Sequence, residues 1–121
     1  MLFKEVGISA ITMIALDSLY LQSVQNAYSN QLKLIQGSPL KLKIIPVIVC
    51  YLILLFGLNY FIIDRKLSLL DAFLFGVVIY GVYDATTCAL IDGWSPYLAV
   101  LDTIWGGILM LTTTYITYSL I

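Results

Sequence analysis

Four long apolar segments follow one another along the chain, separated by short polar stretches. The clearest covers residues 44–63, in which Asn59 is the only strongly polar side chain. Twenty helical residues at about 1.5 Å each span the roughly 30 Å hydrocarbon core of a bilayer. The other segments cover about residues 5–27, 67–91 and 95–121. The pattern therefore predicts four membrane-crossing helices.

Polar residues mark the predicted connections between these helices. The charged residues 64–66 indicate a tight turn, and Gly93 followed by Ser95-Pro96 indicates a turn and a new helix start. Residues 29–43 form the longest connection, and their lysines among leucines fit either a headgroup-level segment or a solvated loop. Helices that alternate in direction form an antiparallel bundle with both chain ends on one side.

Composition agrees with a membrane protein. Hydrophobic residues make up 61% of the chain and charged residues 11%, whereas soluble domains average about 25% charged. A chain of 121 residues has too much surface to hide so much apolar area from water, but a bilayer can accept apolar faces directly. We expect one all-α integral membrane domain over residues 1–121. The first segment is expected to be retained rather than cleaved, because Asp17 interrupts it and no small-x-small site follows.

Charge and residue usage exclude several classes of function. The net charge is −1 and the six Lys and Arg are scattered, so no nucleic-acid partner is expected. The chain has no His, the commonest catalytic base and metal ligand. Cys50 and Cys88 lack metal-site spacing and are interpreted as packing thiols. We assign no catalytic residue, metal or cofactor, and the prediction leans away from an enzyme. Orientation stays open, because the two faces carry three basic residues each: Lys4, Arg65 and Lys66 against Lys33, Lys41 and Lys43.

Three aspartates lie within the predicted helices. Each would cost roughly 2.5–3.5 kcal/mol at the bilayer centre, so Asp17, Asp84 and Asp102 are expected to face the bundle interior. Asp84 precedes Gly93 by nine residues and Asp102 follows it by nine, which places both about 13 Å from that turn. Asp17 lies at a similar depth, and we call these three residues the aspartate layer. Crowded carboxyls in a low dielectric cannot all ionise, so at least one is expected to hold a proton.

Other residues are expected to accompany the aspartate layer. Helical spacing places hydrogen-bond donors on the aspartate faces, and small residues would allow helix backbones to approach closely. The predicted donors are Tyr20, Tyr80, Thr87 and Trp105, and the predicted close-packing residues are Gly76, Gly81, Gly106 and Gly107. Asp71, near the start of the third segment, is better interpreted as a helix cap.

A short internal similarity links the first and fourth segments. Residues 16–20 (LDSLY) and 101–105 (LDTIW) match in kind at every position. Because these helices cross the membrane in opposite directions, an inverted pseudo-repeat would produce this pattern. Five residues in apolar sequence also arise by chance, and the sequence favours chance.

The combined motifs resemble a family of small four-helix membrane proteins labelled as a domain of unknown function, with members in bacteria, algae and large eukaryotic DNA viruses. The viral members are the most similar, including over residues 36–41. That family's Tyr-Asp motif usually continues with Thr-Asn, where this chain has Thr86-Thr87, so a role for the amide does not carry over. The resemblance implies a fold and a membrane location but no activity. It rests on Ala15–Asp17, Tyr20, Tyr80–Thr86, Gly93-Trp94 and Asp102–Gly106.

Three functional hypotheses follow. The aspartate layer could handle protons or cations in a small channel or transporter, expected to be a homo-oligomer because four helices leave little room for a pore. Alternatively, the layer is a protonated, hydrogen-bonded lock, and the protein is a structural membrane component, of a virion's internal membrane if the viral resemblance holds. A lipid-binding or lipid-modifying protein is third, because no nucleophile–base pair is visible. The lipid bilayer is a partner in all three.

Overall fold

The chain is all-α. The computed structural model describes residues 2–36 and 43–121, and of Tyr28 and residues 31–36 only the backbone. Four described helices are long and apolar enough to cross a membrane, which confirms the predicted fold class. The elements are α1 (Phe3–Gln36), α2 (Ile44–Leu58), the π-helix η1 (Asn59–Ile63), α3 (Leu69–Leu90) and α4 (Pro96–Leu120).

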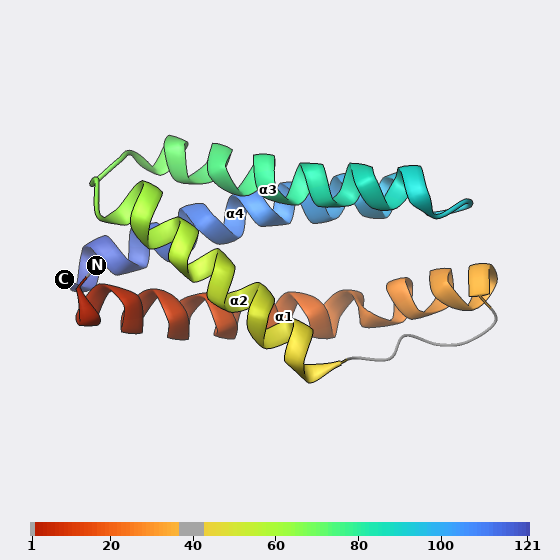
Figure 1. Cartoon of the computed structure of the whole chain (residues 1–121), viewed down its shortest axis with the longest axis horizontal. Helices are drawn as coiled ribbons and strands as arrows, with labels where there is room; N and C mark the ends of the chain where they lie inside the picture. The colour runs from red at the N-terminus through yellow and green to blue at the C-terminus, as the bar shows by residue number, and fades with distance from the viewer. Residues whose placement is uncertain (1, 37–42) are drawn as a thin grey trace.

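The helices alternate in direction, and both chain ends lie at the same end of the bundle (Figure 1). We call this end, which also carries the turn after η1, the terminal side, and the opposite end the Gly93 side. Helices α3 and α4 form the most extensive pair, and α1 packs against α4. Helix α2 crosses the bundle obliquely and joins α3 at the terminal side (Figure 1).

Caps define the ends of α3 and α4. Ser68 is the N-cap of α3, and its hydroxyl and the Asp71 side chain form a capping box. Asp71 therefore stabilises the helix start as the partner of the cap rather than as the cap itself. Ser95 accepts a hydrogen bond from Leu98 N, with Pro96 in the first turn of α4. Gly93 turns the chain with φ of 81°, a value that glycine adopts without steric cost.

Two helices differ from the expected pattern. Helix α1 continues to Gln36, beyond the expected end near residue 27, although its candidate membrane span still ends at Ala27. Residues 28–36 contain neither Gly nor Pro, so the backbone meets no helix breaker. Residues 37–42 of the predicted connection, which include Lys41, and the side chain of Lys33 lie outside the described part of the chain, so the structure does not test whether they lie at headgroup level. The second span changes from α to π geometry at Asn59, whose carbonyl accepts from Asp64 N at 2.8 Å.

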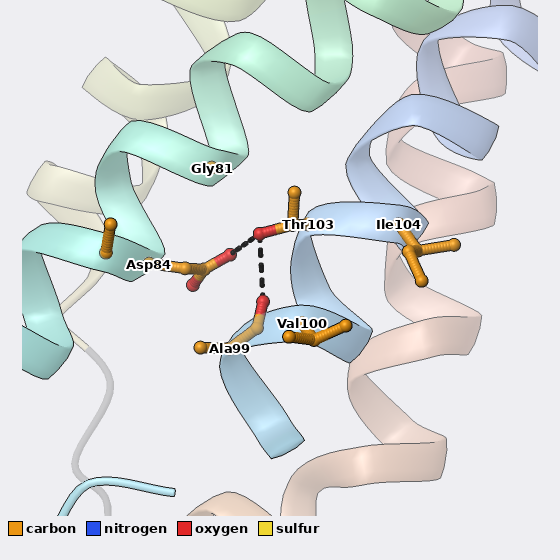
Figure 2. Close-up of a pocket in the computed structure, with 7 residues that line it drawn as sticks. Gly81, Asp84, Ala99, Val100, Thr103 and Ile104 are labelled. Atoms are coloured by element: carbon orange, nitrogen blue, oxygen red, sulfur yellow. Dashed lines mark hydrogen bonds between the residues drawn. The ribbon is translucent and has the colours of Figure 1, made fainter. Parts of the chain in front are cut away.

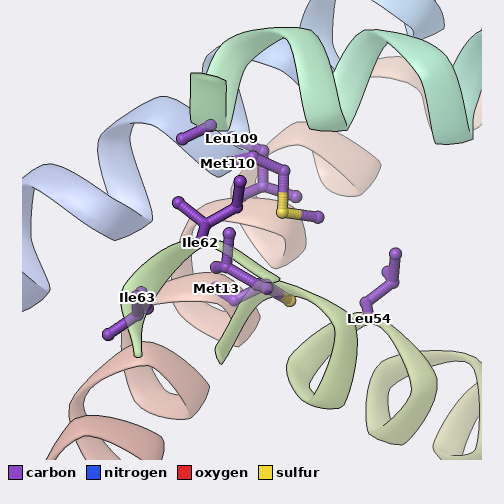
Figure 3. Packing of buried hydrophobic residues seen from close by; sticks show 8 residues of the cluster. Met13, Leu54, Ile62, Ile63, Leu109 and Met110 are labelled. Atoms are coloured by element: carbon purple, nitrogen blue, oxygen red, sulfur yellow. The ribbon is translucent and has the colours of Figure 1, made fainter. Parts of the chain in front are cut away.

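The buried apolar core lies on the terminal side of the aspartate layer. Met13 from α1, Ile62 from η1 and Met110 from α4 pack together (Figure 3). Among the described residues, α1 has no buried side chain after Asp17 and α3 has none after Asp84. On the Gly93 side of the aspartates, α4 alone among the described helices has buried side chains, Leu98 and Ala99, so that half of the bundle is packed more sparsely.

Candidate functional site

Asp17 is the most completely hydrogen-bonded carboxyl of the aspartate layer. It is 8% exposed. Its Oδ2 accepts from the Tyr51 hydroxyl of α2, and its Oδ1 accepts from Trp105 Nε1 of α4 at 3.0 Å. Two neutral donors from two other helices thus compensate this buried acid, and the same bonds join α1 to α2 and α4.

Asp102 and Trp105 of α4 pair with Asp17 and Tyr20 of α1 in a reciprocal arrangement. The Tyr20 hydroxyl donates to Asp102 Oδ1 at 3.2 Å, while Trp105 donates to Asp17. The Tyr20 and Trp105 rings stack, with centroids 4.7 Å apart and planes 4° from parallel. Each helix therefore offers an aspartate and, three residues later, an aromatic donor on the same face. The similarity between residues 16–20 and 101–105 corresponds to this exchange of hydrogen bonds.

Asp84 connects α3 to the same group of residues. It is 5% exposed, and Thr103 Oγ1 lies 3.1 Å from its Oδ2 (Figure 2). The Asp84 carboxyl also interacts electrostatically with the Asp102 carboxyl. The three aspartates are thus related: Asp17 to Asp102 through the stacked rings and their donors, and Asp102 to Asp84 through the electrostatic interaction of their carboxyls.

Thr103 has one hydroxyl proton and two acceptors within reach. Its Oγ1 lies 2.9 Å from the Ala99 carbonyl oxygen and 3.1 Å from Asp84 Oδ2 (Figure 2). A carbonyl oxygen can only accept, whereas a carboxyl can donate when it carries a proton. When Thr103 donates to Ala99, a protonated Asp84 can therefore donate to Thr103.

The other two predicted donors, Tyr80 and Thr87, differ in what they contact. The Tyr80 hydroxyl interacts electrostatically with Asp17 and Asp102. Thr87 instead donates to the Tyr83 carbonyl of its own helix at 2.9 Å.

The predicted small residues line the contact between α3 and α4. A Cβ on Gly76 would stand 2.2 Å from the Gly106 carbonyl oxygen, and one on Gly106 would stand 2.2 Å from Tyr80 Cγ. A Cβ on Gly107 would meet Phe73 and Val77 at 2.7–2.8 Å. Gly81 is less crowded, because its nearest contact would be Thr103 Cγ2 at 3.5 Å.

Tyr51 and Thr103 hydrogen-bond to the aspartates but were not among the predicted site residues. Tyr51 lies in the middle of the most apolar span, where a hydroxyl at mid-membrane depth is itself a signal for a buried partner. Thr103 is adjacent to Asp102 in sequence but hydrogen-bonds to Asp84. Helical spacing from Asp102 could not reveal this, because i and i+1 side chains point in different directions.

A pocket of about 220 Å³ lies against Asp84, between α3 and α4. The small residues Gly81 and Ala99 leave room for this pocket between the helices. Asp84 and Thr103 contribute its polar atoms (Figure 2). Its remaining wall includes Val100 and Ile104, which are 59% and 49% exposed, so the pocket opens on the outer face of the bundle. Within the described residues, no group of three or more His, Cys, Asp or Glu side chains could hold a metal ion.

Comparison with known proteins places the chain in one family. No curated protein and no solved structure matches it. A family described as Predicted membrane protein (DUF2177) matches residues 2–119. This match and the four apolar helices identify a multi-pass integral membrane protein. The chain belongs to this DUF2177 family of predicted membrane proteins.

Proposed function

We propose that the aspartate layer binds and transfers protons within the membrane, as part of a small proton channel or transporter. The observation that carries the proposal is the pair formed by Asp84 and Asp102, two carboxyl groups that interact with one another inside the membrane spans. A hydrogen bond between two carboxyl groups requires a proton on one of them. Ionisable residues inside membrane spans commonly mark such relays.

The surroundings of the pair suit a proton that moves. Thr103 can exchange its acceptor between Ala99 and Asp84, so its hydroxyl can follow a change in the protonation of Asp84. Asp17 accepts hydrogen bonds from two neutral donors. This suits a carboxyl that keeps one protonation state while the protonation of Asp84 and Asp102 changes. The proton therefore belongs to Asp84 and Asp102, with Tyr20 as the donor that holds Asp102 in place.

Packing suggests the side from which protons arrive. The described parts of α1 and α3 have no buried residue on the Gly93 side of the layer. On the terminal side Met13, Leu109 and Met110 are fully buried. Protons would therefore reach the pair from the Gly93 side, and the apolar core would act as the barrier on the terminal side.

A second function, a structural membrane component, is favoured by the hydrogen bonds that join α1, α2 and α4 at Asp17. In that case the layer locks the helices in register and moves no proton.

Proton flux into sealed liposomes separates the two functions. Purified protein is reconstituted with a pH-sensitive dye inside, and a pH gradient is imposed with valinomycin and potassium to balance charge. We expect acidification faster than in empty liposomes for the wild type, and a rate equal to empty liposomes for Asp84→Asn and Asp102→Asn. Asp92→Asn is the matched control, since this exposed aspartate lies in the turn beside Gly93, and it should conduct like the wild type.

The wild type and Asp84→Asn conducting no faster than empty liposomes would overturn the proton proposal. If Asp84→Asn also unfolds at lower denaturant concentration, the structural function would stand in its place. Far-UV circular dichroism of each reconstituted variant verifies that a lost flux is not a lost fold.

A further inference from the structure

A second set of polar side chains is buried in the terminal-side half of the bundle, away from the aspartate layer. All of its members are at most 7% exposed, and all except Glu5 are fully buried. They come from α1, η1 and α4, and they are Glu5, Ser9, Asn59, Thr113, Thr114 and Thr117. Polar atoms at such positions require partners, because the surrounding core is apolar.

Three of these residues share one depth. Ser9 precedes Asp17 by eight residues, Asn59 follows Tyr51 by eight, and Thr113 follows Asp102 by eleven. At about 1.5 Å per residue, all three lie roughly 12–16 Å from the aspartate layer toward the terminal side. Asn59 Nδ2 donates to Ser9 Oγ at 3.0 Å, which joins η1 to α1 at this depth.

The orientation of the Asn59 amide is determined by its partners. Besides Ser9, Asn59 Nδ2 donates to the Leu55 carbonyl oxygen at 2.9 Å. A carbonyl oxygen only accepts, so the amide nitrogen and not the amide oxygen must face it. Asn59 Oδ1 is therefore held in a fixed direction, where it needs a hydrogen-bond donor.

Within the described residues, three of these buried atoms have no hydrogen-bond partner: Asn59 Oδ1, Thr113 Oγ1 and Thr114 Oγ1. The absence is unusual for the threonines, since Thr117 in the same helix donates to the carbonyl four residues earlier, the ordinary solution for a threonine in a membrane helix. Asn59 also begins the π-helix, a distortion that often accompanies functional sites.

We propose that the layer formed by Ser9, Asn59 and Thr113 is an internal water-binding site. Asn59 Oδ1 requires a donor, whereas a threonine hydroxyl proton requires an acceptor, and a water molecule satisfies both. A cation would satisfy only the oxygen lone pairs and would leave the hydroxyl protons unpaired. Waters that bridge otherwise unsatisfied polar groups are regular components of protein interiors.

This site is separated from the aspartate layer and does not depend on its function. Met13, four residues from both Ser9 and Asp17, is fully buried, and so are Leu109 and Met110. Along α1, the buried Met13 therefore stands between the two polar layers, and it packs in one apolar cluster with Ile62 and Met110 (Figure 3). On the terminal side of the water site, Glu5 lies one helical turn before Ser9 on the same face of α1. The buried polar groups therefore continue toward the terminal side.

Water-edited solid-state NMR in deuterated lipid bilayers tests the proposal. Magnetisation is transferred from water to the isotopically labelled protein, and its build-up is compared between the side chains of Asn59, Thr113 and Met13. We expect early build-up at Asn59 and Thr113 and slow build-up at Met13. Build-up at Asn59 no faster than at Met13 would show a dry site and overturn the proposal.

Two variants and a salt exchange sharpen this result. Thr113→Val keeps the shape of the side chain and should slow the build-up at Asn59. Thr86→Val is the matched control, because that exposed hydroxyl donates to the Val82 carbonyl, and it should leave Asn59 unchanged. The Asn59 Cγ shift should be the same in sodium chloride and choline chloride. A shift that follows sodium concentration would instead assign the site to a cation.

Discussion

The aspartate layer is stabilised by donors that come from helices other than the one carrying each acid. Tyr51 and Trp105 serve Asp17, and Tyr20 serves Asp102. A lone carboxyl at the bilayer centre would be expensive, so these donors decide whether α1 and α4 tolerate their acids. The stacked rings of Tyr20 and Trp105 carry one donor each, so this aromatic pair contributes a hydrogen bond to both acids, and Tyr51 adds a second one to Asp17.

Removing one of these donors should destabilise the bundle measurably. Tyr20→Phe keeps the ring against Trp105 and deletes only the hydroxyl that donates to Asp102. Interhelical hydrogen bonds in membranes contribute about 0.6 kcal/mol on average and up to about 1.7, so we expect a loss of about 1 kcal/mol in the free energy of unfolding. Unfolding titrations in mixed detergent–SDS micelles would measure it.

Tyr115→Phe is the matched control for this change. Tyr115 is 57% exposed on α4, so its hydroxyl lies outside the packed interior and its loss should leave stability unchanged. Equal effects of the two substitutions would contradict a specific role for the Tyr20–Asp102 bond.

Among the elements, α3 and α4 approach most closely where glycines face each other. The Cα of Gly76 lies so near the Gly106 carbonyl that an added Cβ would stand 2.2 Å from its oxygen. Such closeness is typical of membrane helix pairs, where close packing of small residues rather than hydrophobic burial drives association. The approach also brings Asp84 within reach of Thr103, because both lie on the same pair of helices.

Adding a methyl group should therefore change the stability differently at two glycines of α3. Gly76→Ala forces a backbone atom to move, and overpacking of this kind costs about 1–3 kcal/mol. At Gly81 the added Cβ would make an ordinary 3.5 Å contact with Thr103. The better helix propensity of alanine should make Gly81→Ala neutral or stabilising by up to about 1 kcal/mol.

The same unfolding titration compares the two alanine variants. A Gly76→Ala protein as stable as Gly81→Ala would mean that α3 and α4 are farther apart in the bilayer than in this structure.

For the whole molecule, both chain ends lie at the same end of the bundle (Figure 1). If the four candidate spans of the described residues all cross the membrane, both ends lie on the same side of it. The bundle is packed unevenly along its length, since its buried apolar cluster lies between the aspartate layer and the terminal side. The Gly93-side half depends on its surroundings more than the terminal-side half does, because fewer of its side chains are enclosed by the protein itself.

Topology can be measured directly in sealed vesicles. Epitope tags at the two chain ends should both be cleaved by an external protease or both be protected. A single protected tag would contradict four complete crossings. Detergent permeabilisation, after which both tags must be cleaved, is the control for protease access.

Much of this organisation follows from the order of residues alone. Four apolar segments of about 20 residues determine membrane insertion and helicity, because lipid offers backbone groups no other partners. The turn between α3 and α4 also follows from the sequence, since Gly93 and Pro96 have conformational preferences that do not depend on the rest of the fold. The energetic cost of acids in lipid predicts that Asp17, Asp84 and Asp102 face inward, although their function stays a prediction.

Only the tertiary structure decided which side chain meets which acid. Hydropathy and spacing are properties of one helix, whereas a hydrogen bond between helices depends on the rotation of each about its axis and on their mutual register. These rotations place Tyr51 within hydrogen-bonding distance of Asp17 and Thr103 within that of Asp84. They leave Thr87 hydrogen-bonded within its own helix. They also bring Asn59 to Ser9, 50 residues apart, a contact that no local pattern in an apolar sequence contains.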